Sequence, residues 1–151
     1  MRSRCGTLLV KEEEMAEGKQ SHEAICERLR AGNETLLADF AAWLADGGLS
    51  PRTVRQHVYN LDLYLNHYLL YDEPIEAPRG VYHASMFLGY WLPRKVPWTS
   101  DATTRGHAAS LNKLYGYLNE RGLVSDDAVA HLRKQLRTGM PGWLVNSRRF
   151  R

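Results

Sequence analysis

Four side chains that can contact phosphates or base edges recur at regular spacing after Ser50. They are Arg52, Arg55, Gln56 and Tyr59. Their spacing of i, i+3, i+4 and i+7 places them on one face of a helix, because each residue turns a helix by about 100°. The amides at a helix N-terminus also favour anions, so this position suits a phosphate. The alternative interpretation is an ordinary solvated face.

A second polar surface is expected on a helix that begins after Ser100. The residues turned away from its apolar side are small or basic, namely Ala102, Gly106, Ala109 and Lys113. Hydroxyl, basic and aromatic residues flank them, namely Thr103, Arg105, Ser110 and Tyr117. Such a face suits the major groove of DNA, which is wide enough to admit one helix. Close packing against another protein helix would require the same small residues.

The basic residues are concentrated in the later part of the chain. Residues 1–48 carry six Lys/Arg and nine Asp/Glu, whereas residues 49–151 carry fourteen Lys/Arg and eight Asp/Glu. The net charges of the two parts are therefore −3 and +6. Clustered Lys and Arg bind polyanions by releasing condensed counterions, so this distribution favours a nucleic-acid partner. A solvated surface without a partner is the alternative.

The helices that must position these two faces have clear ends. Ser50 and Pro51 begin the first, because serine caps free amides and proline at the first helical position loses no hydrogen bond. Ser100 begins the second, and Gly122 ends it. Apolar residues at spacings of three and four predict three further helices, over residues 33–46, 81–92 and 125–136.

These patterns predict an all-α fold, because no β-type alternation competes with them. We expect four or five helices in an orthogonal bundle of two helical hairpins, joined by a proline-bounded middle helix and beginning with Asn33 as a helix cap. The chain divides into a flexible acidic leader (1–20), a helical DNA-binding-like domain (21–137) and a basic C-terminal tail (138–151). For the tail we expect a DNA-contacting arm, a partner-docking peptide around Trp143 or a plain basic end.

Two segments together resemble the core-binding domain of tyrosine recombinases, the phage-integrase-type enzymes. Residues 48–55 (GLSPRTVR), followed by Leu61 and Leu65, resemble its first hairpin. Its second hairpin is resembled by residues 102–105 (ATTR), followed by Leu111, Tyr115, Tyr117-Leu118 and Gly122-Leu123-Val124. The resemblance covers about residues 33–136. It implies a SAM-like helical module that grips one side of a recombination site.

The resemblance also implies which residues face DNA. On the first helix they are Arg52, Thr53, Arg55 and Gln56. On the second helix they are Thr103, Thr104, Arg105, His107 and Lys113. In that family a separate catalytic domain supplies a nucleophilic tyrosine with Arg, Lys and His, and His131-Leu132-Arg133 here has the wrong spacing for that signature. We therefore expect DNA binding without enzyme activity.

The expected partner is double-stranded DNA, with a full-length recombinase or a second copy of the chain as further candidates. We expect no cofactor, and no metal site, because His22 and Cys26 provide only two of the four ligands that structural zinc requires. The apolar stretches are too short to span a bilayer, so we expect a cytoplasmic protein with no membrane partner. The alternative function is a helical protein-interaction or dimerisation module with no nucleic-acid role.

Overall fold

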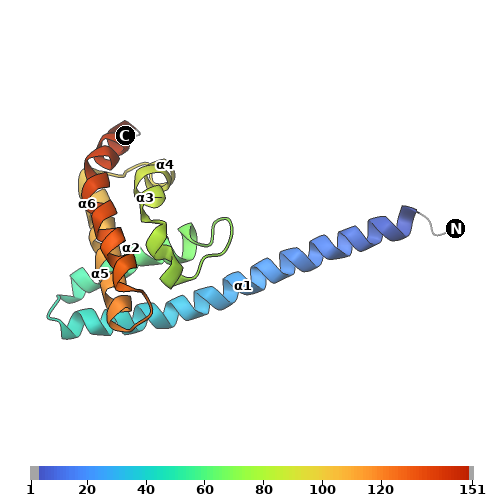
Figure 1. The fold of residues 1–151 in the computed structure, drawn as a ribbon, viewed down its shortest axis with the longest axis horizontal. Coiled ribbons are helices and arrows are strands. Elements are labelled where there is room, and N and C mark those ends of the chain that lie inside the picture. Colours follow the sequence, from blue (N-terminus) through green and yellow to red (C-terminus); the bar gives the residue numbers. More distant parts are fainter. Residues whose placement is uncertain (1–3, 150–151) are drawn as a thin grey trace.

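The computed structural model describes residues 4–149, and the side chains of residues 21–149, and it confirms an all-α fold (Figure 1). The α-helices are α1 (Arg4–Asp46), α2 (Pro51–Asp62), α3 (Ala84–Met86), α4 (Leu92–Lys95), α5 (Asp101–Glu120) and α6 (Asp126–Arg149). Between them lie the π-helices η1 (Leu63–Tyr68) and η3 (Phe87–Trp91) and the 3-10 helix η2 (Ala77–Tyr82). The described part of the chain contains no strand.

Two pairs of consecutive helices, α1 with α2 and α5 with α6, form most of the molecule. Figure 1 shows α5 and α6 running across the α1–α2 pair, while the N-terminal part of α1 projects beyond the other helices. Helix α5 packs against both α2 and α6. Over the described range, no helix is long and apolar enough to cross a membrane.

The predicted helix starts at Ser50 and Ser100 are confirmed. Ser50 Oγ accepts a hydrogen bond from the amide of Thr53 at 3.2 Å, and Pro51 is the first residue of α2. Ser100 Oγ accepts a hydrogen bond from the amide of Thr103 at 3.2 Å, at the start of α5. Each serine satisfies an amide that has no partner within its own helix.

The turn between α5 and α6 is short and held by side-chain hydrogen bonds. Gly122 has a φ of 74°, the left-handed conformation that ends α5 as predicted. Asn119 Nδ2 donates to the carbonyl of Val124 at 2.9 Å and to Asp126 Oδ1 at 2.7 Å. The end of α5 is therefore joined directly to the first residue of α6.

The predicted helix start at Asn33 is wrong, because α1 runs unbroken from Arg4 to Asp46. Asn33 is buried, and its Nδ2 donates to Asn66 Oδ1 at 2.8 Å and to the carbonyl of Leu65 at 3.4 Å. Its side chain therefore joins α1 to η1. Helix α1 also includes residues 4–20 of the expected flexible leader, a stretch without proline that is rich in good helix formers. Residues 1–3 lie outside the described residues.

The middle of the chain forms a series of short helical turns, not the single helix predicted over residues 81–92. The segments η2, α3, η3 and α4 follow one another along residues 77–95. Pro93 does not end this run as expected from the sequence. It lies in the first turn of α4, and the carbonyl of Gly89, four residues earlier, accepts a hydrogen bond from Asn146 Nδ2 at 3.3 Å in place of one from residue 93.

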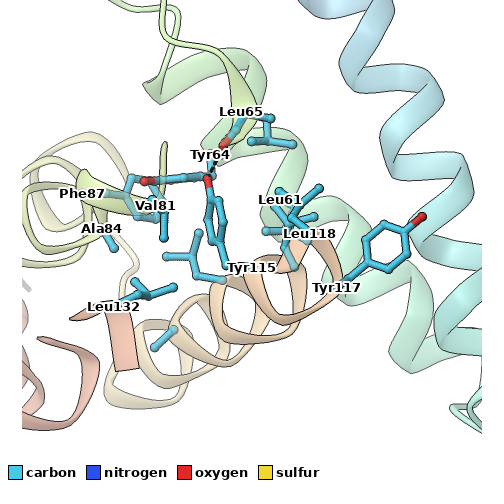
Figure 2. Close-up of a cluster of buried hydrophobic side chains, with 14 of the residues drawn as sticks. Leu61, Tyr64, Leu65, Val81, Ala84, Phe87, Tyr115, Tyr117, Leu118 and Leu132 are labelled. Atoms are coloured by element: carbon cyan, nitrogen blue, oxygen red, sulfur yellow. Dashed lines mark hydrogen bonds between the residues drawn. The ribbon is translucent and has the colours of Figure 1, made fainter. Parts of the chain in front are cut away.

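Tyr64 and Tyr115 lie at the centre of the hydrophobic core (Figure 2). The hydroxyl of Tyr64 donates to the carbonyl of Gly80 at 2.6 Å, and that of Tyr115 donates to the carbonyl of Ala77 at 2.7 Å. Burial raises the pKa of both hydroxyls, so they stay protonated and remain donors. Phe87 packs edge-on against Tyr64, with ring centroids 4.9 Å apart. The two tyrosines therefore attach the middle segment to the bundle.

Helix α6 continues to Arg149, through most of the segment expected to be a basic tail. Trp143 is buried in the core, where it packs against Gly89 and Gly139. A Cβ added at Gly89 would lie 2.6 Å from Trp143 Cδ1, so glycine is needed there to admit the indole ring. Of the three alternatives for this segment, the partner-docking peptide around Trp143 does not fit, because the indole ring is buried in the core.

Candidate nucleic-acid interface

The first turns of α2 present polar side chains toward α5. Arg52, Thr53 and Gln56 are exposed, and they line a groove of about 350 Å³ between the two helices. Gly106 and Ala109 form the α5 side of this groove, and their small size leaves the α5 backbone accessible. We call this depression the polar groove. It brings together the N-terminal halves of the two helices that the sequence predicts to be functional.

A chain of side-chain hydrogen bonds fixes α2 against α5 at the polar groove. Gln56 Nε2 donates to Asn60 Oδ1 at 3.0 Å, and Asn60 Nδ2 donates to Ser110 Oγ at 3.0 Å. Ser110 Oγ donates its single proton to the carbonyl of Gly106 at 3.0 Å. His57 Nδ1 lies 2.7 Å from the same oxygen, so the proton of that bond comes from the imidazole. These bonds hold the polar groups of both helices in one register.

The surface around the polar groove carries positive charge. Its lining includes Arg52 and contains no Asp or Glu. Arg105 and Lys113 lie four residues before and after Ala109, so they share its side of α5, and Arg105 is exposed. Burial lowers the pKa of His57, and the charge of Lys113 lowers it further. The arrangement provides cations and hydrogen-bond donors without a competing carboxylate in the groove.

Arg55 and Tyr59, which were predicted to share a face with Arg52, border α1 and not α5. They line a second groove of about 820 Å³ between α2 and α1. Most of the other residues lining this groove are apolar, namely Leu37, Ala38, Ala41, Val54 and Val58. We call it the apolar groove. The structure therefore divides the predicted α2 face between two different surroundings.

Thr104 and His107 lie in the interior and not on the surface where the resemblance placed them. Thr104 is fully buried and His107 is 6% exposed. His107 packs edge-on against Phe87, with ring centroids 5.7 Å apart, and burial lowers its pKa to about 4. Thr104 precedes Ala108 by four residues and His107 precedes Leu111 by four, so both belong to the apolar side of α5.

His57 and Asn60 belong to the polar groove, although the sequence analysis did not select them. Asn60 is 5% exposed and lies next to Leu61, within the half of α2 that faces the other helices. Its polar side chain does not contribute to the apolar spacing that marks a packed helix face. The sequence signal for this site was the pair of His57 and Asn60. Two hydrogen-bonding residues at i and i+3 on a packed face need a polar partner on the neighbouring helix. Ser110 is that partner.

The chemistry that this site supports is the binding of anions by charge-assisted hydrogen bonds. Among the residues whose side chains are described, no group of three or more His, Cys, Asp or Glu could hold a metal ion. No family model matches the chain, and neither a curated protein nor a solved structure shows significant similarity to it. The geometry of the two grooves therefore carries the functional argument.

Proposed function

We propose that this chain is a DNA-binding module that holds duplex DNA against the polar groove, in the manner of the core-binding domain of a phage-integrase-type recombinase. The observation that carries the proposal is the hydrogen-bonded contact between α2 and α5. Through Asn60 and Ser110, it places Arg52 of α2 beside the small-residue face of α5. The sequence resemblance supports the same two helices.

Binding would begin with electrostatic attraction and continue with insertion of α5. Arg52, Arg105 and Lys113 would neutralise phosphates, and this term carries no sequence information. Gly106 and Ala109 would let the α5 backbone approach the base edges closely, because they have little or no side chain. Thr53 and Gln56 are exposed at the same groove, where they can donate and accept hydrogen bonds.

The test is fluorescence anisotropy of the full chain with a labelled random duplex of about 30 base pairs, titrated at several salt concentrations. Three phosphate contacts predict a slope of log K against log salt of about −2.7, at about −0.9 per contact. The variant Arg105→Gln should weaken binding and reduce the magnitude of the slope by about one contact. The matched control is Arg30→Gln, because Arg30 is an exposed arginine that lines the apolar groove.

Two outcomes would contradict the proposal. A folded protein that does not bind the duplex at low salt is not a DNA-binding module of this kind. Equal losses in Arg105→Gln and Arg30→Gln would show that binding is not located at the polar groove. Self-association that is insensitive to salt, without DNA binding, would instead favour the protein-interaction alternative, since apolar contacts are screened far less than phosphate contacts.

A further inference from the structure

Helix α5 has a second groove on the side opposite α2. This α5–α6 groove has a volume of about 410 Å³ and is lined by Ala108, Ala109, Asn112, Arg133, Leu136 and Arg137. Ala109 lines the polar groove as well, so the two grooves meet on one surface. The lining of the α5–α6 groove, like that of the polar groove, contains no Asp or Glu.

The contacts of α5 show that α2 and α6 flank it on opposite sides. Ser110 contacts α2 through Asn60, whereas Asn112 contacts α6 through Arg133. Ser110 and Asn112 are two residues apart, so they point in directions that differ by about 200° around the helix. The outward strip of α5 that includes Ala109 therefore lies between a wall formed by α2 and a wall formed by α6.

Arg133 is held in place at the α6 wall. Its Nε donates to Asn112 Oδ1 at 3.0 Å, and a Cβ added at Gly116 would lie only 3.3 Å from its Nη2. The side chain therefore lies along α5, where glycine leaves room for it. Arg133 is nevertheless exposed, as is Arg137 one turn later. The bond to Asn112 uses one of the five N–H donors of the guanidinium, which leaves donors that can face a ligand.

The charge of α6 favours an anion along this wall. After Asp127, residues 128–149 contain five Lys/Arg and no Asp/Glu. Of these five, Arg148 is paired with Asp101 at 2.6 Å, and Arg133 and Arg137 line the α5–α6 groove. The surface that borders α5 is therefore basic on both sides, with Arg52 on the α2 wall.

The spacing of the two walls fits one feature of duplex DNA. Packed helices have axes 8–10 Å apart, so the axes of α2 and α6 on either side of α5 are roughly 16–20 Å apart. The exposed side chains of Arg52 and Arg137 on the two walls are long enough to extend into this span and narrow it. A major groove about 12 Å wide matches the narrowed span, whereas a minor groove about 6 Å wide is too small for it.

We propose that Arg133 and Arg137 of α6 contact the DNA backbone on the side of α5 opposite to Arg52, so that the two walls hold the phosphates that border one major groove. This inference rests on the proposed function and extends it from two helices to three. It raises the expected number of phosphate contacts from three to five. The expected salt slope of the unmodified chain then becomes about −4.5 in place of about −2.7.

The experiment repeats the anisotropy titration with the double variant Arg133→Gln/Arg137→Gln. We expect its salt slope to be smaller in magnitude than that of the unmodified chain by about 2, because each phosphate contact contributes about 1. The control is Lys134→Gln, which removes one charge from an exposed position of the same helix that does not line the groove. The charge-keeping variant Arg133→Lys/Arg137→Lys should retain the slope, and thermal unfolding of each variant verifies that it is folded.

The outcomes separate this inference from the proposed function. If the double variant keeps the slope of the unmodified chain while Arg105→Gln loses about one contact, the α6 wall is excluded and the α2–α5 interface stands. A double variant that changes no more than Lys134→Gln also overturns the α6 contact. If the unmodified chain binds no duplex at low salt, the proposed function and this inference both fail.

Discussion

Helix α2 borders a groove on each side, and the two grooves have different linings. On the α5 side, Gln56, Asn60 and Ser110 form a hydrogen-bonded chain under an exposed arginine. On the α1 side, five of the eleven lining residues are aliphatic, and the charged residues Arg30, Glu34, Arg55 and Asp62 lie among them. The carboxylates of Glu34 and Asp62 repel phosphates and offset the arginines there, whereas the polar groove has a cation and donors without a carboxylate. Helix α2 is therefore suited to bind a polyanion on its α5 side only.

The difference also shows what the spacing of residues on a single helix does and does not determine. Arg52 and Arg55 are three residues apart and share the outer face of α2 by helical geometry. Their surroundings differ because α5 packs beside the first and α1 beside the second. Residues that share one helical face can therefore have different roles, because different neighbouring helices pack beside them.

Acid should destabilise the molecule through the α5 side. Burial lowers the pKa of His107 from 6.5 to about 4, so between these values the unfolded chain binds more protons than the folded one. Stability contributed by neutral His107 is fully present above pH 6.5 and is lost as pH falls toward 4. The loss amounts to about 3 kcal/mol, at 1.36 kcal/mol per pKa unit. Urea unfolding at pH 7, 5.5 and 4.5 would measure it.

The control for the acid prediction is His107→Leu, which removes the titrating group from the core. Carboxylates and other histidines titrate in both proteins, so the difference between the two pH profiles isolates His107. Parallel profiles would mean that His107 does not lose its hydration on folding, contrary to its 6% exposure.

Removing the Ser110 hydroxyl, at the centre of the polar contact between α2 and α5, should have the next largest effect on stability. Ser110→Ala takes a hydrogen-bond partner from both His57 and Asn60, and Asn60 is buried. Leaving such groups unsatisfied costs about 1–3 kcal/mol of unfolding free energy. Thr35→Ala is the control, because that exposed hydroxyl bonds only to the carbonyl of Ala31 in its own helix. Equal midpoints of urea unfolding in the two variants would argue against a stabilising role for the polar contact.

The smallest expected effect is the difference in salt slope between variants on the two sides of α2. Arg52→Gln and Arg55→Gln remove the same charge from exposed positions three residues apart. We expect Arg52→Gln to reduce the magnitude of the salt slope for duplex DNA by about 0.9. Arg55→Gln should leave the slope unchanged, because Arg55 lines the apolar groove. The reverse result would place the DNA on the α1 side and would exchange the roles of the two grooves.

Local features of the fold could be predicted because local chemistry determines them. Ser50, Ser100 and Gly122 act at helix ends through their own side chains or backbone, and all three are confirmed. Asn33 shows where this reasoning fails. A capping residue type at a suitable position forms a tertiary hydrogen bond to Asn66, and only the packing of η1 against α1 makes that bond available.

The remaining differences depend on partners distant in sequence. From the sequence, Trp143 resembles an exposed aromatic anchor in a basic tail. Its burial requires the space that Gly89 provides on another helical segment. The sequence around Arg133 predicts only an amphipathic helix. The direction of its side chain depends on its hydrogen bond to Asn112 of α5. The assignment of Thr104 to the surface came from the resemblance, whereas its spacing of four residues from the buried Ala108 agrees with its burial.

The turn at Gly122 has a mechanical consequence for the surface around α5. Asn119 ties the end of α5 to Val124 and Asp126, so α5 and α6 are expected to move as one rigid body. Helix α2 has no short connection to α5, because residues 63–100 lie between them, and it is held to α5 by packing and by hydrogen bonds such as that of Asn60. Any adjustment of the distance between the outer walls would thus occur at the α2–α5 contact, while the α5–α6 spacing stays constant.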